Sequence, residues 1–187
     1  MKFAHKVAVI GLGMGVHHLQ AAISYGAEIL AIVDTDEEIL KKVGGENGIP
    51  EDRRYTDWKK VLTLPVNEVI IATPDQLHRE MAIAFLEAGK NIMCEKPLAL
   101  TREDMTAIIQ AAKKSDKKFM VGQICRFTPA FVKAKELIDG GEIGEIYYAE
   151  SEYAHDYAKI LAAGGWRADP VRNGVVGGGC HAVDLLR

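Results

Sequence analysis

Short, almost wholly apolar segments recur through the first 120 residues and alternate with segments of helical periodicity. A strand that is apolar throughout is buried on both faces, which is typical of a parallel sheet covered by helices on each side. The pattern therefore predicts an α/β fold, with a doubly wound Rossmann domain over residues 1–122. The expected strands are residues 6–10, 27–33, 68–72, 91–94 and 119–121, and the expected helices begin near residues 16, 36, 58, 77 and 101.

The pattern changes after residue 122. Thr128 and Pro129 predict the start of a helix, which the glycines at 140–141 should end. Residues 146–153 are rich in aromatic side chains and alternate in polarity, so they predict a longer strand, and HAVDLLR predicts a final helix. We therefore expect residues 123–187 to be the start of a second, incomplete domain. The side chains expected to face inward from its first helix are Phe131, Ala134, Leu137 and Ile138.

Composition excludes several classes of partner. The chain has 187 residues and a formal net charge of −3, which disfavours nucleic acid and anionic membrane surfaces as partners. It has no apolar run of about 18 residues, and the opening MKFAHKVAVIGLGMG does not resemble a signal peptide. Cys94, Cys125 and Cys180 form no CxxC pair, so we expect a reduced, cytoplasmic protein without a disulfide framework or a metal site. Cys94 and Cys125 are expected to be small buried side chains.

A glycine-rich turn, GLGMG, stands between the first strand and the first helix. Glycines at such a turn let the backbone approach a pyrophosphate, which then lies on the helix N-terminus. The usual G-x-G-x-x-G pattern would have glycine where this chain has Val16, so either the loop is one residue shorter or the helix packs differently. A turn that binds no ligand is the alternative. The residues expected to contact a dinucleotide here are Gly11, Leu12, Gly13, Met14, Gly15 and Val16.

Asp34 ends the second strand, 23 residues after Gly11. That spacing matches the carboxylate that binds the ribose hydroxyls of NAD. A carboxylate about 4 Å from a 2′-phosphate would repel it by roughly 1–4 kcal/mol, and no arginine follows to bind the phosphate. We therefore expect NAD rather than NADP, with Thr35 also near the cofactor. Alternatively, Asp34 caps the next helix, although Thr35 and Glu38 already form a capping-box pattern.

Several motifs occur together in a characteristic order: GLGMGVHH, ATPDQLH at 72–78, CEKPLALT at 94–101, GWRADP and GGGCHAVD. This set resembles the Gfo/Idh/MocA family, which includes glucose-fructose oxidoreductase and inositol dehydrogenase. The resemblance implies a Rossmann domain followed by a domain with a mostly antiparallel sheet, which serves substrate binding and oligomerisation. It also implies an NAD(P)-dependent dehydrogenase that transfers hydride between nicotinamide and a hydroxyl carbon of a sugar, polyol or cyclitol. Because members usually exceed 300 residues, the chain is expected to be truncated in its second domain, and the full-length protein to be a homo-oligomer.

Lys96 lies in the E-K-P motif at the end of a central strand, where ligands bind in such sheets. Consecutive residues of an extended segment point to opposite sides, so Glu95 should turn toward the protein and Lys96 toward the cofactor and substrate. Pro97 restricts the backbone of Lys96 to extended conformations, and a cis bond is compatible with the sequence. The resemblance implies that Lys96 is catalytic and binds substrate.

By the same resemblance, His181 matches the family's catalytic histidine, whose ordinary pKa of about 6.5 suits proton exchange. Many members have an aspartate four residues earlier, where this chain has Gly177, so a two-residue proton relay is in doubt. Asp184 is expected in the first turn of the last helix, where a carboxylate is favourable. A buried histidine with a purely structural role is the alternative for His181.

The resemblance implies further contacts. Besides the glycine turn, the implied cofactor contacts are Asp34, Thr35, Thr73, Pro74, His78, Glu95 and Lys96. The implied substrate contacts are Lys96, Arg126, Trp166, Arg167 and His181. His78 could equally be an ordinary histidine of a first helical turn, and Tyr153 and His155 are weaker candidates for the substrate side. Two other functions remain open, namely an NAD-using glycoside hydrolase of the same family and a dinucleotide-binding protein without turnover.

Overall fold

The computed structural model describes residues 5–187, except for the side chains of residues 160 and 161. These residues form two compact units, one ending at Val121 and the other comprising Gly122–Arg187. Each unit is described by itself below.

The first unit is built on a six-stranded parallel sheet with the strand order β3-β2-β1-β4-β5-β6. The chain starts at β1 in the middle, winds outward to β3, returns to β4 beside β1 and winds outward again to β6. The doubly wound Rossmann sheet predicted from the apolar segments is therefore confirmed. The strands are β1 (Lys6–Ile10), β2 (Glu28–Val33), β3 (Arg54–Tyr55), β4 (Glu68–Ile71), β5 (Asn91–Cys94) and β6 (Phe119–Val121).

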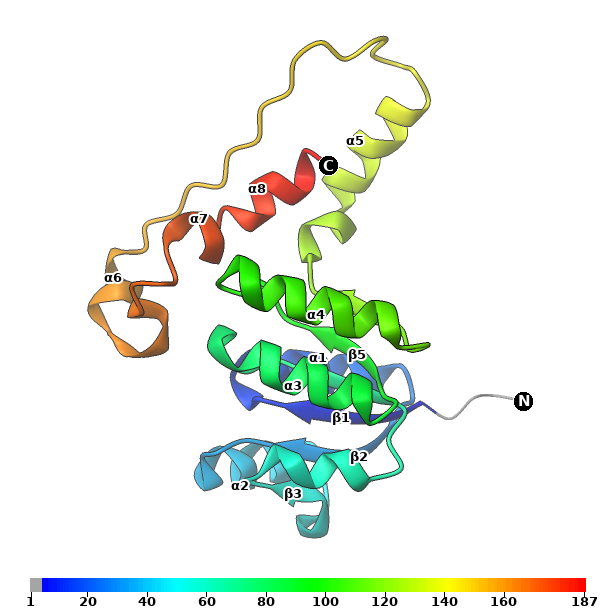
Figure 1. The fold of residues 1–187 in the computed structure, drawn as a ribbon, viewed down its shortest axis with the longest axis vertical. Helices are drawn as coiled ribbons and strands as arrows, with labels where there is room; N and C mark the ends of the chain where they lie inside the picture. The colour runs from blue at the N-terminus through cyan, green and yellow to red at the C-terminus, as the bar shows by residue number, and fades with distance from the viewer. Residues whose placement is uncertain (1–4) are drawn as a thin grey trace. The chain divides into compact units, whose positions relative to one another are not determined.

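Helices cover both faces of this sheet (Figure 1). Side chains from α1 (Leu12–Ser24) and α2 (Glu37–Glu46) form one apolar core with Val7, Val9 and Ile32. Side chains from α3 (His78–Glu87) and α4 (Arg102–Lys114) form the other core with strand residues such as Ile10, Val69 and Ile71. The short helices η1 (Glu51–Arg53), η2 (Trp58–Thr63) and η3 (Asp75–Leu77) complete the connections.

Side-chain caps explain where α2 and α4 begin. Thr101 caps α4, since its hydroxyl accepts the amide of Asp104 at 3.1 Å, and the helix begins where the sequence predicted. The start of α2 differs from the prediction. Asp36, not Thr35, is the N-cap, because its carboxylate reaches the amides of Glu38 and Ile39 at 2.9 and 3.2 Å.

At the glycine turn, the backbone of Gly11 lies very close to the backbone of Ala72. Gly11 has φ of 83°, and a β-carbon added there would lie 2.6 Å from the carbonyl oxygen of Ala72, just beyond β4. Helix α1 begins immediately after Gly11, and a β-carbon at Gly15 would lie 3.2–3.3 Å from Val9 and Ala72. Gly15 therefore provides the close helix–sheet packing, which is why Val16 is tolerated one position later.

The second unit is helical in its described residues. It consists of η4 (Ile124–Phe127), α5 (Pro129–Asp139), α6 (Ala158–Ala162), η5 (Gly165–Ala168), α7 (Gly174–Gly177) and α8 (Cys180–Leu185). Pro129 at the start of α5 and the final helix are confirmed.

Two predictions for this unit are wrong. Residues 146–153 form no strand, and Tyr147 is 98% exposed. A strand needs a neighbour to pair its backbone groups, and the described part of 122–187 supplies no second strand. The apolar side of α5 also does not face inward, since Phe131, Leu137 and Ile138 are 38–42% exposed. The antiparallel sheet expected for the second domain is thus not present in this unit as described.

No helix among the described residues has both the length and the apolar character needed to cross a lipid bilayer.

The contrast between two glycines of the turn can be tested. Gly11→Ala should lower the free energy of unfolding by about 1–3 kcal/mol, because alanine disfavours a positive φ and its methyl group would meet the Ala72 carbonyl. Gly13→Ala is the matched control, since a β-carbon there meets nothing within 4 Å inside a helix. It should leave stability unchanged or raise it by up to about 1 kcal/mol. Urea unfolding of the three proteins measures both effects, and equal midpoints would contradict the packing described.

Candidate active site

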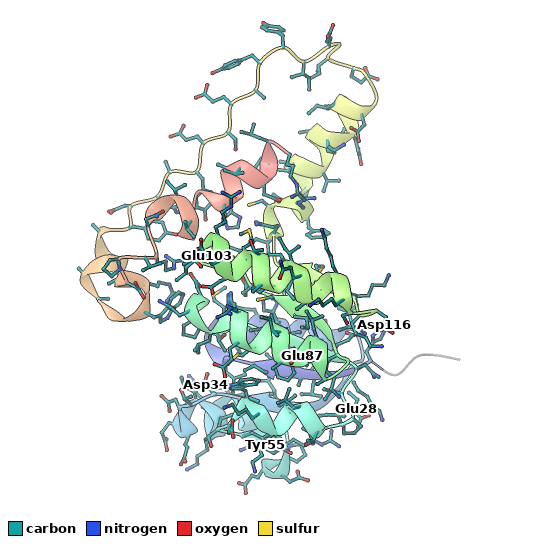
Figure 2. The ribbon with its side chains drawn as sticks, viewed as in Figure 1. Glu28, Asp34, Tyr55, Glu87, Glu103 and Asp116 are labelled. Atoms are coloured by element: carbon teal, nitrogen blue, oxygen red, sulfur yellow. The ribbon has the colours of Figure 1, made fainter. Side chains whose placement is uncertain are left out.

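The candidate cofactor residues meet at one edge of the first unit. The glycine turn follows β1, Asp34 follows β2, Thr73 follows β4 and Lys96 follows β5. All these strands are parallel, so their carboxyl ends lie at the same edge, and β1 and β4 form the switch point where ligands bind in such sheets. Figure 2 shows Asp34 and Glu28 at opposite ends of β2, with Asp34 at the carboxyl edge.

The N-terminus of α1 suits a phosphate group. No side chain caps it at Gly11, and its first turn contains no acidic residue. Gly13 and Met14 are exposed, and the space where a side chain of Gly13 would project is open. The amide of Leu12 donates to Asp34, whereas the backbone N–H groups of the residues that follow it in the first turn favour an anion. The turn therefore fits the pyrophosphate of a dinucleotide.

Asp34 is held against this turn. One carboxylate oxygen accepts the amide of Leu12 at 2.8 Å, and the other accepts the amide of Asp36 at 3.1 Å. Since Asp36 caps α2 itself, Asp34 is not the helix cap that the alternative interpretation required. Each oxygen of a carboxylate can accept more than one hydrogen bond, so Asp34 can still accept bonds from a ribose diol. Thr35 is exposed beside it.

Glu95 turns into the protein, as the alternation of strand residues predicted. Its Oε1 lies 2.7 Å from Nε2 of His18 in α1, and its Oε2 accepts the backbone amide of Lys96 at 3.1 Å. Both side chains of the His18–Glu95 pair are mostly buried, with 21% and 14% of their surface exposed. Sequence reasoning missed His18, because 77 residues separate the two partners and no local pattern links them.

The carboxyl group of Glu95 stays ionised. Burial by itself would raise its pKa, but the hydrogen bonds from His18 and from the Lys96 amide, together with the positive charge of Lys96, hold the pKa below its usual value. Glu95 therefore provides a fixed negative charge beside Lys96. The peptide bond between Lys96 and Pro97 is cis.

His78, the first residue of α3, contacts the loop that follows β5 and carries Lys96 and Pro97. We call this segment the Lys96 loop. The ring of His78 is fully buried, with Nδ1 2.9 Å from the carbonyl oxygen of Pro97 and Nε2 3.1 Å from that of Thr73. Both ring nitrogens are therefore engaged by the backbone, which favours the structural interpretation of His78 over cofactor contact. The hydroxyl of Thr73 lies 3.7 Å from the sulfur of Met81, and Pro74 precedes η3.

Cys94 ends β5 and is fully buried, as predicted. Burial raises the pKa of its thiol, and the nearby carboxylates of Glu95 and Asp75 raise the pKa further. The thiol is thus neutral and acts as a small apolar side chain at the base of the Lys96 loop.

His181 is the buried polar residue of interest in the second unit, with 2% of its surface exposed. Its ring lies 4.8 Å from that of Tyr153, and its Nδ1 lies 3.5 Å from the sulfur of Cys125. Cys125 is only partly buried, so the prediction that it is a small buried side chain is wrong. Where many relatives would have an aspartate, a β-carbon at Gly177 would meet the guanidinium of Arg172 at 2.5 Å.

Arg126 and Asp184 form a pair that the sequence did not reveal. Two nitrogens of the Arg126 guanidinium donate to the two oxygens of Asp184, each at 2.7 Å. Asp184 is the fifth residue of α8, which begins at Cys180, so its expected placement in the first turn is wrong. The hydrogen bond from Arg126 lowers the pKa of Asp184 below its usual value, although partial burial opposes the shift. The pair ties η4 to α8 and engages a side chain that was expected to contact substrate.

A hollow of about 600 Å³ lies within the second unit. Its size is in the range of small-molecule sites. Trp166 directly precedes Arg167, one of the residues that line the hollow. Its ring stacks against the guanidinium groups of Arg167 and Arg172, at 4.2 and 5.2 Å. The polar and aromatic residues that line the hollow include Tyr153, His155, Tyr157, Arg167, Asp169, Arg172 and Asn173.

Across residues 5–187, no group of three or more His, Cys, Asp or Glu side chains is arranged to hold a metal ion.

Comparison with known families gives two matches that together span most of the chain. A profile described as "Oxidoreductase family, NAD-binding Rossmann fold" (GFO_IDH_MocA) matches residues 5–123. A second profile, "GFO/IDH/MocA C-terminal domain", matches residues 131–187.

Individual relatives agree with these profiles. The chain is 35% identical over 164 residues to levoglucosan dehydrogenase of Pseudarthrobacter phenanthrenivorans, covering 80% of this chain and 38% of that protein. It is 37% identical over 153 residues to scyllo-inositol 2-dehydrogenase (NAD(+)) of Bacillus subtilis, covering 79% and 44%. The crystal structure of myo-inositol 2-dehydrogenase from Lactobacillus plantarum superposes with a TM-score of 0.88 at 26% identity, covering 97% and 55%. The chain thus spans about half the length of these relatives or less.

The lowered pKa of Glu95 predicts a specific pH dependence. A depressed pKa in the folded state stabilises the fold above the unfolded pKa of about 4.3, and this contribution is lost as pH falls through the folded pKa. Glu95→Gln should therefore unfold more readily at pH 7 and lose less stability below about pH 4.3 than the unmodified chain. Denaturant unfolding between pH 7 and pH 3 measures this, with Glu46→Gln, an exposed position on α2, as control. Identical pH slopes for Glu95→Gln and the unmodified chain would contradict the prediction.

Proposed function

Because the chain belongs to the Gfo/Idh/MocA oxidoreductase family, we propose that it is the cofactor-binding part of an NAD-dependent dehydrogenase, followed by the beginning of the substrate-binding part. The proposed reaction is hydride transfer between nicotinamide and a hydroxyl-bearing carbon of a sugar, polyol or cyclitol. The observation that carries the proposal is the convergence of the glycine turn, Asp34 and Lys96 at the carboxyl edge of one parallel sheet.

The first unit supplies the cofactor site. A bound nicotinamide would supply the hydride chemistry, and the residues of the chain would bind and orient the reactants and handle protons. The N-terminus of α1 holds the pyrophosphate, and Asp34, fixed by the amide of Leu12, accepts the ribose hydroxyls. A carboxylate at that place disfavours a 2′-phosphate, which supports NAD over NADP. The relative from Bacillus subtilis is named for NAD(+) as well.

Lys96 is the proposed substrate-binding and catalytic residue of the first unit. Its backbone N–H donates a hydrogen bond to the side-chain carboxylate of Glu95, and the negative charge of that carboxylate also balances the charge of the lysine. An ammonium group can donate a hydrogen bond to the reacting oxygen and so stabilise the charge that develops there. In the second unit, His181 is the proposed proton acceptor, held by Tyr153 and Cys125.

The substrate class is inferred from the relatives and from the hollow in the second unit. The relatives named above carry levoglucosan, scyllo-inositol and myo-inositol in their names, and each is a ring compound with several hydroxyl groups. The hollow combines aromatic rings, which can contact the apolar faces of such a ring, with Arg167 and Asn173, which can bind its hydroxyls. We assign substrate binding to this unit, and to its continuation in a full-length homo-oligomer.

Cofactor choice can be tested on the 187-residue chain. NAD should raise its melting temperature more than NADP does at equal concentration, because Asp34 accepts the ribose diol and repels a 2′-phosphate. Asp34→Ala should reduce the difference between the two cofactors, whereas Glu46→Ala should not. Thermal unfolding with each cofactor measures the shifts. A larger shift with NADP would overturn the assignment of Asp34.

Catalysis by Lys96 can be tested in the natural protein that carries these residues. NADH formation should be seen at 340 nm with NAD and a panel that includes the inositols and levoglucosan. Lys96→Ala should slow it by roughly 10²–10⁴-fold while NAD affinity changes little, because the lost ammonium acts on the substrate and not on the cofactor. Lys41→Ala, at an exposed position on α2, is the control.

The same assay separates the alternatives. Substrate cleavage without net NADH would indicate the NAD-using hydrolase, and NAD binding without turnover on any compound would indicate a protein that only binds the dinucleotide. Near-normal turnover in Lys96→Ala would refute the role of Lys96.

A further inference from the structure

We propose that His18 is a positioning residue for the reaction, because it holds the Lys96 loop at a fixed place relative to the glycine turn through its contact with Glu95. The inference rests on the proposed function in assigning the reaction to Lys96, but its structural part stands on the His18–Glu95 contact itself.

The contact between His18 and Glu95 is short and sheltered. Nε2 of His18 lies 2.7 Å from Oε1 of Glu95, a distance typical of a charge-assisted hydrogen bond. The Glu95 side chain is 14% exposed, so little water competes for its carboxylate. The carboxyl group is ionised, since hydrogen bonds from His18 and Lys96 lower its pKa despite burial. An acceptor with a full charge makes the bond from the histidine stronger than a bond between neutral groups.

The second oxygen of Glu95 carries this restraint to Lys96. It accepts the backbone amide of Lys96 at 3.1 Å, so one carboxylate joins a helix side chain to the main chain of the next residue. The amide of Glu95 donates to the carbonyl of Ile71 in β4 at 2.8 Å, which fixes the start of the loop in the sheet. If His18 did not hold the carboxylate, the Glu95 side chain could rotate, and the amide of Lys96 would lose its acceptor.

The position of His18 on α1 explains why this matters for the reaction. His18 lies in the second turn of the helix whose first turn is the proposed pyrophosphate site. The contact with Glu95 therefore restrains the distance between the first turn of α1, which is the proposed pyrophosphate site, and the loop that carries Lys96. Catalytic groups displaced by about 1 Å can lose roughly 100-fold in rate, so a rigid link of this kind affects turnover more than binding.

His78 holds the same loop differently. It is fully buried, and its two ring nitrogens contact the backbone carbonyls of Pro97 and Thr73, so replacing it would disturb the core. His18 retains 21% exposure, which makes its replacement compatible with folding. The two histidines act on opposite sides of the loop, but only His18 can be changed to isolate the effect on Lys96.

Three variants test the inference. His18→Leu removes the hydrogen-bond donor and keeps much of the side-chain volume. His18→Gln keeps an N–H donor of similar reach and is the conservative rescue. His17→Leu is the matched control, because His17 is the exposed neighbour on the same helix and turn. Urea unfolding of each variant confirms that the first unit is folded.

The first measurement does not depend on turnover. The amide of Lys96 should exchange with solvent roughly tenfold faster in His18→Leu, because its acceptor is no longer held in place. Exchange in His18→Gln and His17→Leu should remain within about twofold of the unmodified chain. Hydrogen exchange of the 187-residue chain, resolved at Lys96 by NMR, measures this. Unchanged exchange in His18→Leu would overturn the structural part of the inference.

The second measurement uses NADH formation by the natural protein. His18→Leu should lower kcat by roughly 10- to 100-fold, with the KM for NAD within about twofold, and His18→Gln should restore most of kcat. A defect in KM alone, or a glutamine variant as slow as the leucine variant, would overturn the positioning role. If the unmodified protein forms no NADH with any compound, the proposed function fails, and the exchange result still decides whether His18 fixes the Lys96 loop.

Discussion

Burial of a parallel sheet on both faces is the constraint on which the first unit depends. Parallel strands can be joined only by crossovers, and each crossover here returns a helix to one face of the sheet. As a consequence, every strand ends at the same edge, and residues that are far apart in sequence follow those ends together. Asp34 and Lys96 are 62 positions apart in the numbering, yet both lie just beyond the carboxyl ends of strands of one sheet, β2 and β5. The chemistry of the edge is therefore a result of how the core must be covered.

Precision at that edge comes from a few buried polar contacts. Asp34 is fixed by backbone amides, Glu95 by His18 and the Lys96 amide, and the loop after Lys96 by His78. Each of these contacts links an element on one side of the sheet to a loop at its edge. A buried polar group must find its partners to be tolerated, so such contacts define one geometry where apolar packing alone would accept several. In the second unit, the bidentate pair of Arg126 and Asp184 also fixes a geometry, although the Arg126 side chain is 45% exposed.

Local and periodic signals in the sequence predicted most strands of the first unit, because a strand buried on two faces is a continuous run of apolar residues. The two-residue strand Arg54–Tyr55 contains no such run, and Asp36 replaced Thr35 as a cap because both are good capping residues one position apart. The contacts of His18 and Cys125 join residues 77 and 56 positions apart, so no local pattern could reveal them. Residues 146–153 have the composition of a strand, but pairing is a property of two segments, and composition describes only one.

The three glycines of the turn differ in whether the fold requires a residue without a side chain. Gly11 is required by the Ala72 carbonyl and by its positive φ, and Gly15 by the side chains of Val9 and Ala72. Apart from the chain neighbours of Gly13 and the backbone of its own helix, no atom of residues 5–187 lies within 4 Å of a β-carbon built there, and alanine would favour the helix more than glycine does. Selection for folding alone would thus let position 13 drift toward alanine. Glycine at position 13 keeps the backbone of the first helical turn open, at the place where we propose that the dinucleotide binds.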